Sequence, residues 1–278
     1  MCRLYGFRAN EPTKVECTLV RAQNALLIQS GGDLRGQTHP DGWGIARYEN
    51  GLPTVERRAT AAFADLHFSV AAERVYARTV VAHVRDATVG TPSIDNTHPF
   101  VHGRWVFAHN GTVRGVDRLE PELLREIGPE LAAERRGSTD SELSFLWVLS
   151  RLRAEGIDLE SVAGEPRRLA AALARAVRTL AKWSRSTGTG KQERLNFLLT
   201  DGHTMVVSRW HNGLYWTRRE GVHDCEICGI PHVRHDCNVH YRAAVVASEP
   251  ISHEEWREIP EASVLLIDPE LEATVLPL

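Results

Sequence analysis

The sequence predicts an α+β layered fold, in which sheets carry helices on their faces. Strand-like runs and one short helical run precede His109, two long helical runs follow, and strand-like runs return from Arg194. Strands and helices segregated in this way are typical of α+β proteins. A hydrophobic fraction of 42% and 25% charged residues are enough for a sizeable core. Without a linker or an internal repeat, we expect a single domain over residues 1–278.

Short runs rich in β-branched and aromatic residues predict the strands of the first half. A helix is expected over residues 17–29, where apolar residues recur at helical spacing, and Gly31-Gly32 would end it. The Asn50-Gly51 pair predicts a hairpin turn. The expected strands cover residues 3–7, 45–48, 54–57, 79–85 and 104–109.

The middle of the chain predicts two helices. Thr139 and Glu142 have the spacing of a capping box, which predicts a helix from there through residue 152. Pro166 is typical of a first helical turn and begins a second helix that runs to about residue 182. Residues 184–190 are expected to form a flexible loop.

Strand patterns dominate the last third of the chain. The pairs Asp201-Gly202 and Asn212-Gly213 both predict hairpin turns between neighbouring strands. The expected strands cover residues 195–200, 204–210, 214–217, 241–247 and 263–267.

The charge balance and hydropathy exclude two classes of partner. The 33 basic and 36 acidic residues give a net charge of −3, so no basic excess supports a sequence-independent grip on nucleic acid. No apolar run approaches the length of a membrane span, and the first residues lack the apolar region of a signal peptide. We therefore expect a cytoplasmic protein that acts on a small molecule, without nucleic acid or membrane.

Cys2 is the first residue with chemical potential. Removal of Met1 is expected because cysteine is small, and it would leave a thiol and a free α-amine on one Cα. An α-amine titrates near pH 8 and can accept a proton from the thiol. Taken alone, a cysteine at position two is common and carries little weight.

Three further positions have both a functional and a structural interpretation. Asn110-Gly111 offers an amide and an approachable backbone N–H for an oxyanion, or is a plain turn. Arg85 is suited to a carboxylate, or forms a surface salt bridge. Asp140 at a helix start is suited to an ammonium group, or complements the helix dipole.

Together these residues lie in six segments that resemble the class II glutamine amidotransferases, members of the N-terminal nucleophile hydrolase superfamily. The resemblance is strongest to the stand-alone YafJ-like branch, which includes the γ-glutamyl hydrolase of ergothioneine biosynthesis. It covers the first half of the chain at the family's spacing. The matching segments are residues 1–6 (MCRLYG), 39–44 (HPDGWG), 82–88 (AHVRDAT), 96–100 (NTHPF), 108–111 (AHNG) and 138–142 (STDSE).

The resemblance implies a four-layer αββα sandwich and a set of site residues. Cys2 would be the nucleophile and its α-amine the general base, with Asn110 and Gly111 as the oxyanion hole. Arg85 and Thr88 would bind the α-carboxylate of glutamine, and Asp140 its α-ammonium group. No cofactor or catalytic metal is required. The histidines of the motifs, His83, His98 and His109, would pack around the site rather than transfer protons.

Two features depart from the family pattern. Asp86 follows Arg85 where relatives usually carry an aromatic residue, so the pocket wall and the substrate would differ. No phosphate loop or dinucleotide motif marks a synthase domain. The resemblance then implies either a separate ammonia-accepting synthase subunit or hydrolysis of a γ-glutamyl amide as the complete reaction.

A cluster of cysteines and histidines near the end of the chain has two interpretations. Cys225, Cys228, His232, His235 and Cys237 have ligand spacings compatible with a structural zinc ion, which would staple the loop. All five fall within one loop, which favours a reduced, metal-free loop. The cluster also motivates a rival function, a non-catalytic zinc-stabilised interaction protein.

A second rival is an N-terminal-cysteine acylase for another amide. Arg85 with Asp140 argues against it, because this pair suits an amino-acid zwitterion.

Overall fold

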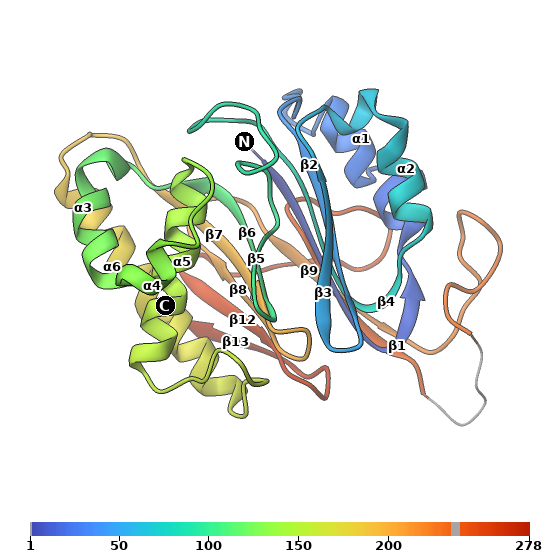
Figure 1. Ribbon diagram of the computed structural model, residues 1–278. Coiled ribbons are helices and arrows are strands. Elements are labelled where there is room, and N and C mark those ends of the chain that lie inside the picture. The colour runs from blue at the N-terminus through green and yellow to red at the C-terminus, as the bar shows by residue number, and fades with distance from the viewer. Residues whose placement is uncertain (1, 235–239) are drawn as a thin grey trace.

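The computed structural model describes residues 2–234 and 240–278 and contains two antiparallel sheets that face each other (Figure 1). The larger sheet, sheet A, has the order β11 (Arg257–Glu258), β9 (Tyr215–Glu220), β10 (Arg242–Ala247), β1 (Arg3–Lys14), β4 (Tyr76–Val84), β2 (Trp43–Glu49), β3 (Leu52–Arg58). The smaller, sheet B, has the order β13 (Ala273–Pro277), β12 (Ser263–Ile267), β8 (Met205–Arg209), β7 (Arg194–Thr200), β6 (Trp105–Thr112), β5 (Phe100–His102).

Helices cover the outer face of each sheet, which completes a four-layer αββα sandwich (Figure 1). The helical segments over sheet A are η1 (Cys17–Arg21), α1 (Leu26–Gly31), η2 (Ala62–Ala64) and α2 (Leu66–Glu73). Those over sheet B are α3 (Val116–Ile127), α4 (Pro129–Ala132), α5 (Asp140–Ala154) and α6 (Pro166–Ser186). The fold class expected from the sequence is therefore confirmed.

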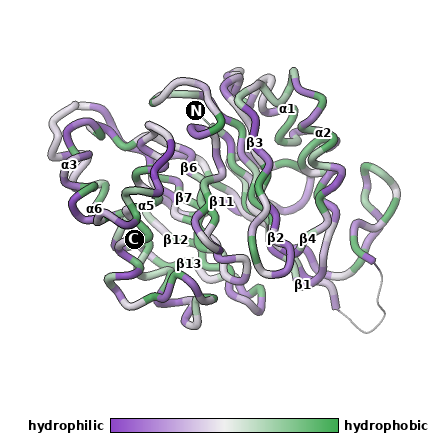
Figure 2. Tube along the Cα trace, viewed as in Figure 1, coloured by the Kyte–Doolittle hydropathy of each residue, from purple (hydrophilic) through white to green (hydrophobic). Residues whose placement is uncertain are grey.

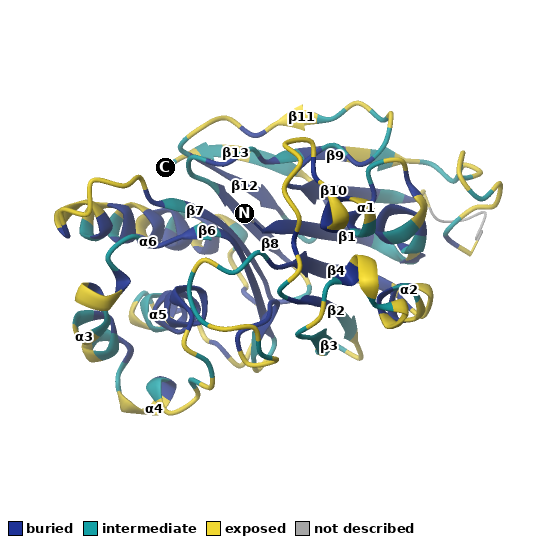
Figure 3. Ribbon diagram, turned by 90° about the horizontal axis from the view of Figure 1, so that it is seen from above, coloured by how far each residue is buried: buried dark blue, intermediate teal, exposed yellow. Residues whose placement is uncertain are grey.

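Three apolar cores correspond to the three interfaces between these layers. One lies between the sheets, one between sheet A and its helices, and one between sheet B and its helices. Figure 3 shows the central strands of both sheets almost wholly buried, whereas the edge strands β3, β11 and β13 carry intermediate and exposed residues. Burial of both sheet faces explains why most strands read as continuous apolar runs rather than as alternating ones.

Strand β1 has a central position that brings Cys2 between the two sheets. It pairs with β4 on one side and with β10 on the other. Figure 1 shows the amino terminus between the upper ends of the two sheets. The strand is longer than the expected residues 3–7, because buried Arg8 donates to backbone carbonyls of Ala9 and His203 and so tolerates burial.

The single helix expected over residues 17–29 is wrong. The segment forms the π-helical turn η1, becomes extended at Ala22, and resumes as α1. Tertiary contacts explain the break, because the Asn24 side chain donates to the Pro250 carbonyl and its N–H to the Ile251 carbonyl. The expected end at Gly31-Gly32 is confirmed.

The hairpin expected at Asn212-Gly213 is also wrong. The turns at Asn50-Gly51 and Asp201-Gly202 do join paired strands, but Asn212 lies where the chain crosses from β8 of sheet B to β9 of sheet A. The Asn212 side chain donates to the backbone carbonyl of Asn110, so it serves the junction between the sheets rather than a tight turn.

The capping box is half confirmed. Thr139 accepts the N–H of Glu142 at 3.1 Å, as expected. The Glu142 carboxylate instead accepts the N–H groups of Arg136 and Gly137, because the preceding loop folds back over the helix start. Elements without a strong local pattern were not expected from the sequence, namely η2, α2, α3, α4, β5, β11 and β13.

Candidate active site

Cys2 lies immediately before β1 and is held by its backbone as well as its thiol. Its side chain is 8% exposed, and its sulfur accepts the N–H of Asp86 at 3.4 Å. Arg3 donates to the Cys2 carbonyl at 3.0 Å and is itself paired with the buried carboxylates of Asp33 and Glu249. These bonds fix Cys2 at the upper end of the sandwich.

The surroundings of Cys2 keep its thiol protonated at rest. Burial raises the pKa of Cys2, and the Asp86 N–H only partly opposes that effect. A protonated thiol needs a base before it can attack a carbonyl carbon.

The motif histidines do not supply that base. Burial lowers the pKa of His83 to about 3 and also lowers the pKa values of His98 and His109. His83 stacks on His98 at 4.1 Å between ring centroids, and His109 contacts Ser141 and the Arg194 carbonyl. This geometry agrees with the packing role expected for them.

A single hydroxyl group, that of Ser248, links Asn110 to β1, the strand that directly follows Cys2. The Asn110 Nδ2 donates to Ser248 Oγ at 3.0 Å, and the same oxygen accepts the N–H of Leu4 in β1 at 2.9 Å. Asn110 and Gly111 lie inside β6, so the interpretation of this pair as a turn is excluded. The Asn110 amide has two N–H groups, and among the described residues the Ser248 bond uses one of them, so the other could donate to a ligand.

Gly111 is fixed by close packing between strands. A Cβ atom at this position would lie 1.9 Å from the backbone oxygen of Arg194 in β7. Only glycine therefore allows β6 and β7 to approach here.

Arg85 is buried rather than part of a surface salt bridge. Its guanidinium donates to the carbonyls of residues 89–91, at 2.9 Å to Val89 and to Gly90. These bonds leave two of its five N–H groups for a ligand within the described chain. Burial lowers the pKa of Arg85, while the nearby acidic groups Cys2, Asp41 and Asp140 oppose the shift.

Asp140 faces this region from the first turn of α5. Its carboxylate accepts the N–H of Val113, just beyond β6, at 2.7 Å, so its position is coupled to the strand that carries Asn110. Thr88 contacts Thr112 at 3.0 Å between hydroxyl oxygens, which draws the loop after β4 toward the end of β6. All six expected site residues thus belong to connected elements at one end of the sandwich.

The motif at residues 39–44 supports the segment that directly follows β4, residues 85–87. Asp41 accepts the N–H of Ala87 at 2.7 Å, and the Gly42 carbonyl accepts the N–H of Arg85 at 2.8 Å. A Cβ at Gly44 would lie 2.2 Å from the His98 carbonyl, so this glycine allows two motif segments to touch.

Two residues that hold the site together were not expected there, because Ser248 had no sequence signal and Asn212 was predicted to lie in a hairpin turn. Ser248 follows β10, and Asn212 lies in the crossover, yet both bond to Asn110. Neither stands in a motif, and only the pairing of β1 with β10 brings Ser248 to the nucleophile.

Comparisons with known proteins identify the family of this chain. The family model of class II glutamine amidotransferases matches residues 1–272. A probable glutamine amidotransferase of Saccharomyces cerevisiae is 30% identical over 96% of this chain and 82% of its own length. YafJ of Escherichia coli is 29% identical, with 93% and 94% covered. The chain belongs to the class II glutamine amidotransferases.

Within that family its similarities lie with the YafJ-like branch. A γ-glutamyl-hercynylcysteine sulfoxide hydrolase of Mycobacterium tuberculosis is 32% identical over 41% of this chain and 50% of its own length. A glutamine aminotransferase class-II domain protein from Silicibacter pomeroyi has the same fold, with a TM-score of 0.65, 24% identity and 99% of each chain covered.

The chain is therefore an amidohydrolase-type enzyme, and neither rival class is favoured. Across the described residues, we find no helix long and apolar enough to cross a membrane.

Proposed function

We propose that the chain hydrolyses a γ-glutamyl amide with Cys2 as the nucleophile, after removal of Met1. The observation that carries the proposal is the link from Leu4 through Ser248 to Asn110. It sets an amide donor in register with the strand that begins at the nucleophile. Met1 itself lies outside the described residues.

The two ends of the substrate's amino-acid moiety have complementary partners. The unused N–H groups of Arg85, with the Thr88 hydroxyl, would bind the α-carboxylate. Asp140 would bind the α-ammonium. Its carboxylate is buried, and the backbone N–H of Val113 holds one of its oxygens in place. This pairing supports an α-amino acid as the recognised group.

The proposed reaction proceeds through a thioester. The α-amine of Cys2 takes the thiol proton as sulfur attacks the γ-carbonyl carbon, and Asn110 and Gly111 donate to the oxyanion. The C–N bond then breaks, and the leaving ammonia or amine takes the proton from the α-ammonium. Water, deprotonated by the same amine, attacks the thioester carbon and releases glutamate and the thiol.

The leaving group distinguishes two forms of this function. We propose a γ-glutamyl amide of an amine metabolite as the substrate, supported by the similarity to a γ-glutamyl hydrolase and by the carboxyl-bearing Asp86 next to Cys2. The alternative is glutamine itself, with ammonia passed to a separate synthase subunit. A free thiol nucleophile also suits the reducing cytoplasm.

Intact mass spectrometry tests the nucleophile. The purified chain should lack the mass of Met1 and gain one adduct on incubation with a diazoketone analogue of glutamine. Peptide mapping should locate that adduct on Cys2, with Cys17 and Cys225 of the same molecule as unmodified internal controls. A processed, folded chain whose adduct maps elsewhere would refute the assignment.

Glutamate release tests the substrate class. A γ-glutamyl anilide and glutamine are compared at equal concentration, and the anilide is expected to give the higher kcat/KM. A higher kcat/KM for glutamine would instead favour an ammonia-supplying subunit.

A further inference from the structure

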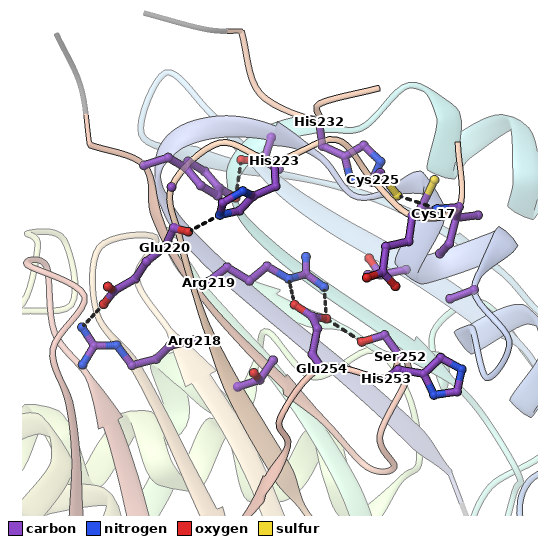
Figure 4. Close-up of a pocket in the computed structure, with 18 of the residues that line it drawn as sticks. Cys17, Arg218, Arg219, Glu220, His223, Cys225, His232, Ser252, His253 and Glu254 are labelled. Carbon is purple, nitrogen blue, oxygen red and sulfur yellow. Dashed lines mark hydrogen bonds and ion pairs between the residues drawn. The ribbon is translucent and has the colours of Figure 1, made fainter. Parts of the chain in front are cut away.

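Four side chains with soft ligand atoms meet on the outer face of sheet A, away from Cys2. Cys17 comes from η1, and Cys225, Cys228 and His232 come from the loop between β9 and β10. Their ligand atoms all lie within 4.8 Å of one another, and Cys228 Sγ is 3.3 Å from His232 Nε2. Figure 4 shows Cys17, Cys225 and His232 converging from these separate segments.

The spacing fits a tetrahedral metal ion. Zinc binds thiolate sulfur at about 2.3 Å and imidazole nitrogen at about 2.0–2.1 Å, so neighbouring ligand atoms of a tetrahedron are about 3.6–3.8 Å apart. The cluster needs only small side-chain adjustments to reach that size. Three thiolates and one imidazole select zinc over the harder cations, which prefer oxygen ligands.

The backbone of the loop is already shaped for this role. Gly229 has a φ of +74° and donates to the Cys225 carbonyl at 2.8 Å, so the turn directs both cysteines to one side. The N–H of Ile227 points at Cys225 Sγ at 3.4 Å, which would stabilise a thiolate.

The end of β1 positions the fourth ligand. The His232 carbonyl accepts the N–H of Lys14 at 2.8 Å, and Val233 forms a bridge with Thr13. His232 is therefore fixed against the same strand that leads toward Cys17.

Burial of apolar side chains does not explain why the loop adopts this form. Ile227 and Ile230 are 44% and 58% exposed, although they are the apolar residues at its tip. In Figure 2 this apolar stretch projects from the right-hand edge of the molecule. Within residues 2–234 and 240–278 the cysteines are free thiols, so no disulfide there holds the loop in place of buried apolar contacts.

We propose that Cys17, Cys225, Cys228 and His232 bind one structural zinc ion. All four positions are protein ligands, so the ion has no open site for water or substrate and ties the loop to η1. The sequence suggested zinc without Cys17 and with His235 and Cys237, which lie outside the described residues. The proposal is independent of the proposed reaction.

The bound ion would shape a cavity next to it. A space of about 740 Å³ is lined by Cys17, Cys225 and His232 on one side and by the ion pair of Arg219 with Glu254 on another (Figure 4). If the loop between β9 and β10 moved away from η1, this wall of the cavity would open.

Metal analysis of the full chain tests the proposal. After purification under reducing conditions and gel filtration, elemental analysis should find about one zinc per chain. The Cys17→Ser variant should lose about tenfold or more of that content. The matched control is Cys2→Ala, which removes a cysteine outside the cluster and should keep about one zinc.

Cobalt substitution keeps the test independent of how the variants fold. The wild-type chain reconstituted with Co²⁺ should show the intense visible bands of a tetrahedral site and sulfur-to-cobalt charge transfer in the near ultraviolet. Three outcomes would each overturn the proposal. They are equal zinc content in Cys17→Ser and the wild type, a weak octahedral cobalt spectrum, and a disulfide between Cys17 and the loop in the native chain.

Discussion

Replacement of Ser248 by alanine should separate the positioning of Asn110 from simple loss of stability. The hydroxyl is buried and accepts two N–H groups, from Leu4 at 2.9 Å and from Asn110 at 3.0 Å. A buried donor left unsatisfied costs about 1–3 kcal/mol, so the two donors together predict a loss of about 2–6 kcal/mol in the free energy of unfolding. Released from its anchor, the Asn110 amide would stabilise the oxyanion less well.

The kinetic effect has an upper bound. Loss of one oxyanion donor reduces kcat by about 10²–10³-fold, so Ser248→Ala should reduce kcat by less than Asn110→Ala does. KM should change little, because Arg85 and Asp140 hold the substrate from other elements. Glutamate release and urea unfolding measure the two effects on the same preparations.

Ser208→Ala is the matched control. Ser208 is equally buried, and its hydroxyl accepts the N–H of Phe197 at 3.0 Å and donates to the Leu195 carbonyl at 2.8 Å. The Ser208→Ala variant should therefore lose a similar free energy of unfolding but keep the kcat of the wild type. If Ser248→Ala reduced kcat no more than Ser208→Ala, with both folded, the coupling between β1 and Asn110 would be refuted.

Three further predictions follow from the site and its supports. Asp140→Asn keeps an oxygen that can accept the Val113 N–H, but it loses the negative charge. KM for a γ-glutamyl substrate should therefore rise about 10- to 100-fold. An unchanged KM in steady-state assays would contradict the assignment. His83 has a pKa of about 3 in the folded chain, below its ordinary 6.5, so the unfolded chain binds the extra proton and stability falls as the pH falls from about 6.5 toward 3. Urea unfolding of His83→Asn should show a slope smaller by about 1.4 kcal/mol per pH unit, and an equal slope would exclude His83 as the source. Gly111→Ala should lose about 3 kcal/mol because its Cβ meets the Arg194 carbonyl, whereas Gly164→Ala, in open space, should be neutral in thermal denaturation.

The sequence predicted most strands, because their patterns are local. The β-branched run before Arg85 forms β4, and Asn50-Gly51 joins β2 to β3, as expected. Motif residues were also predictable, since six short segments keep a fixed spacing around Cys2.

The errors arose where distant segments decide the local structure. Asn212-Gly213 has the composition of a hairpin turn, but the bond from Asn212 to Asn110 belongs to a crossover between sheets. Asn24 breaks the expected helix because it bonds to the Pro250 carbonyl. Ser248 and the approach of Cys17 to Cys225 depend on the packing of strands far apart in sequence, which periodicity does not report.

The place of β1 between β4 and β10 also sets an order of events during synthesis. One edge of β1 stays unpaired until the ribosome has added β10, almost at the end of the chain. At about 5–20 residues per second, this leaves roughly 10–50 s in which the amino terminus is open to an aminopeptidase. Ser248 arrives with β10, so Asn110 receives its anchor only after that interval. Under the proposed function, the nascent chain would be processed before Asn110 is anchored, so cleavage of amides would begin only after β10 has paired with β1.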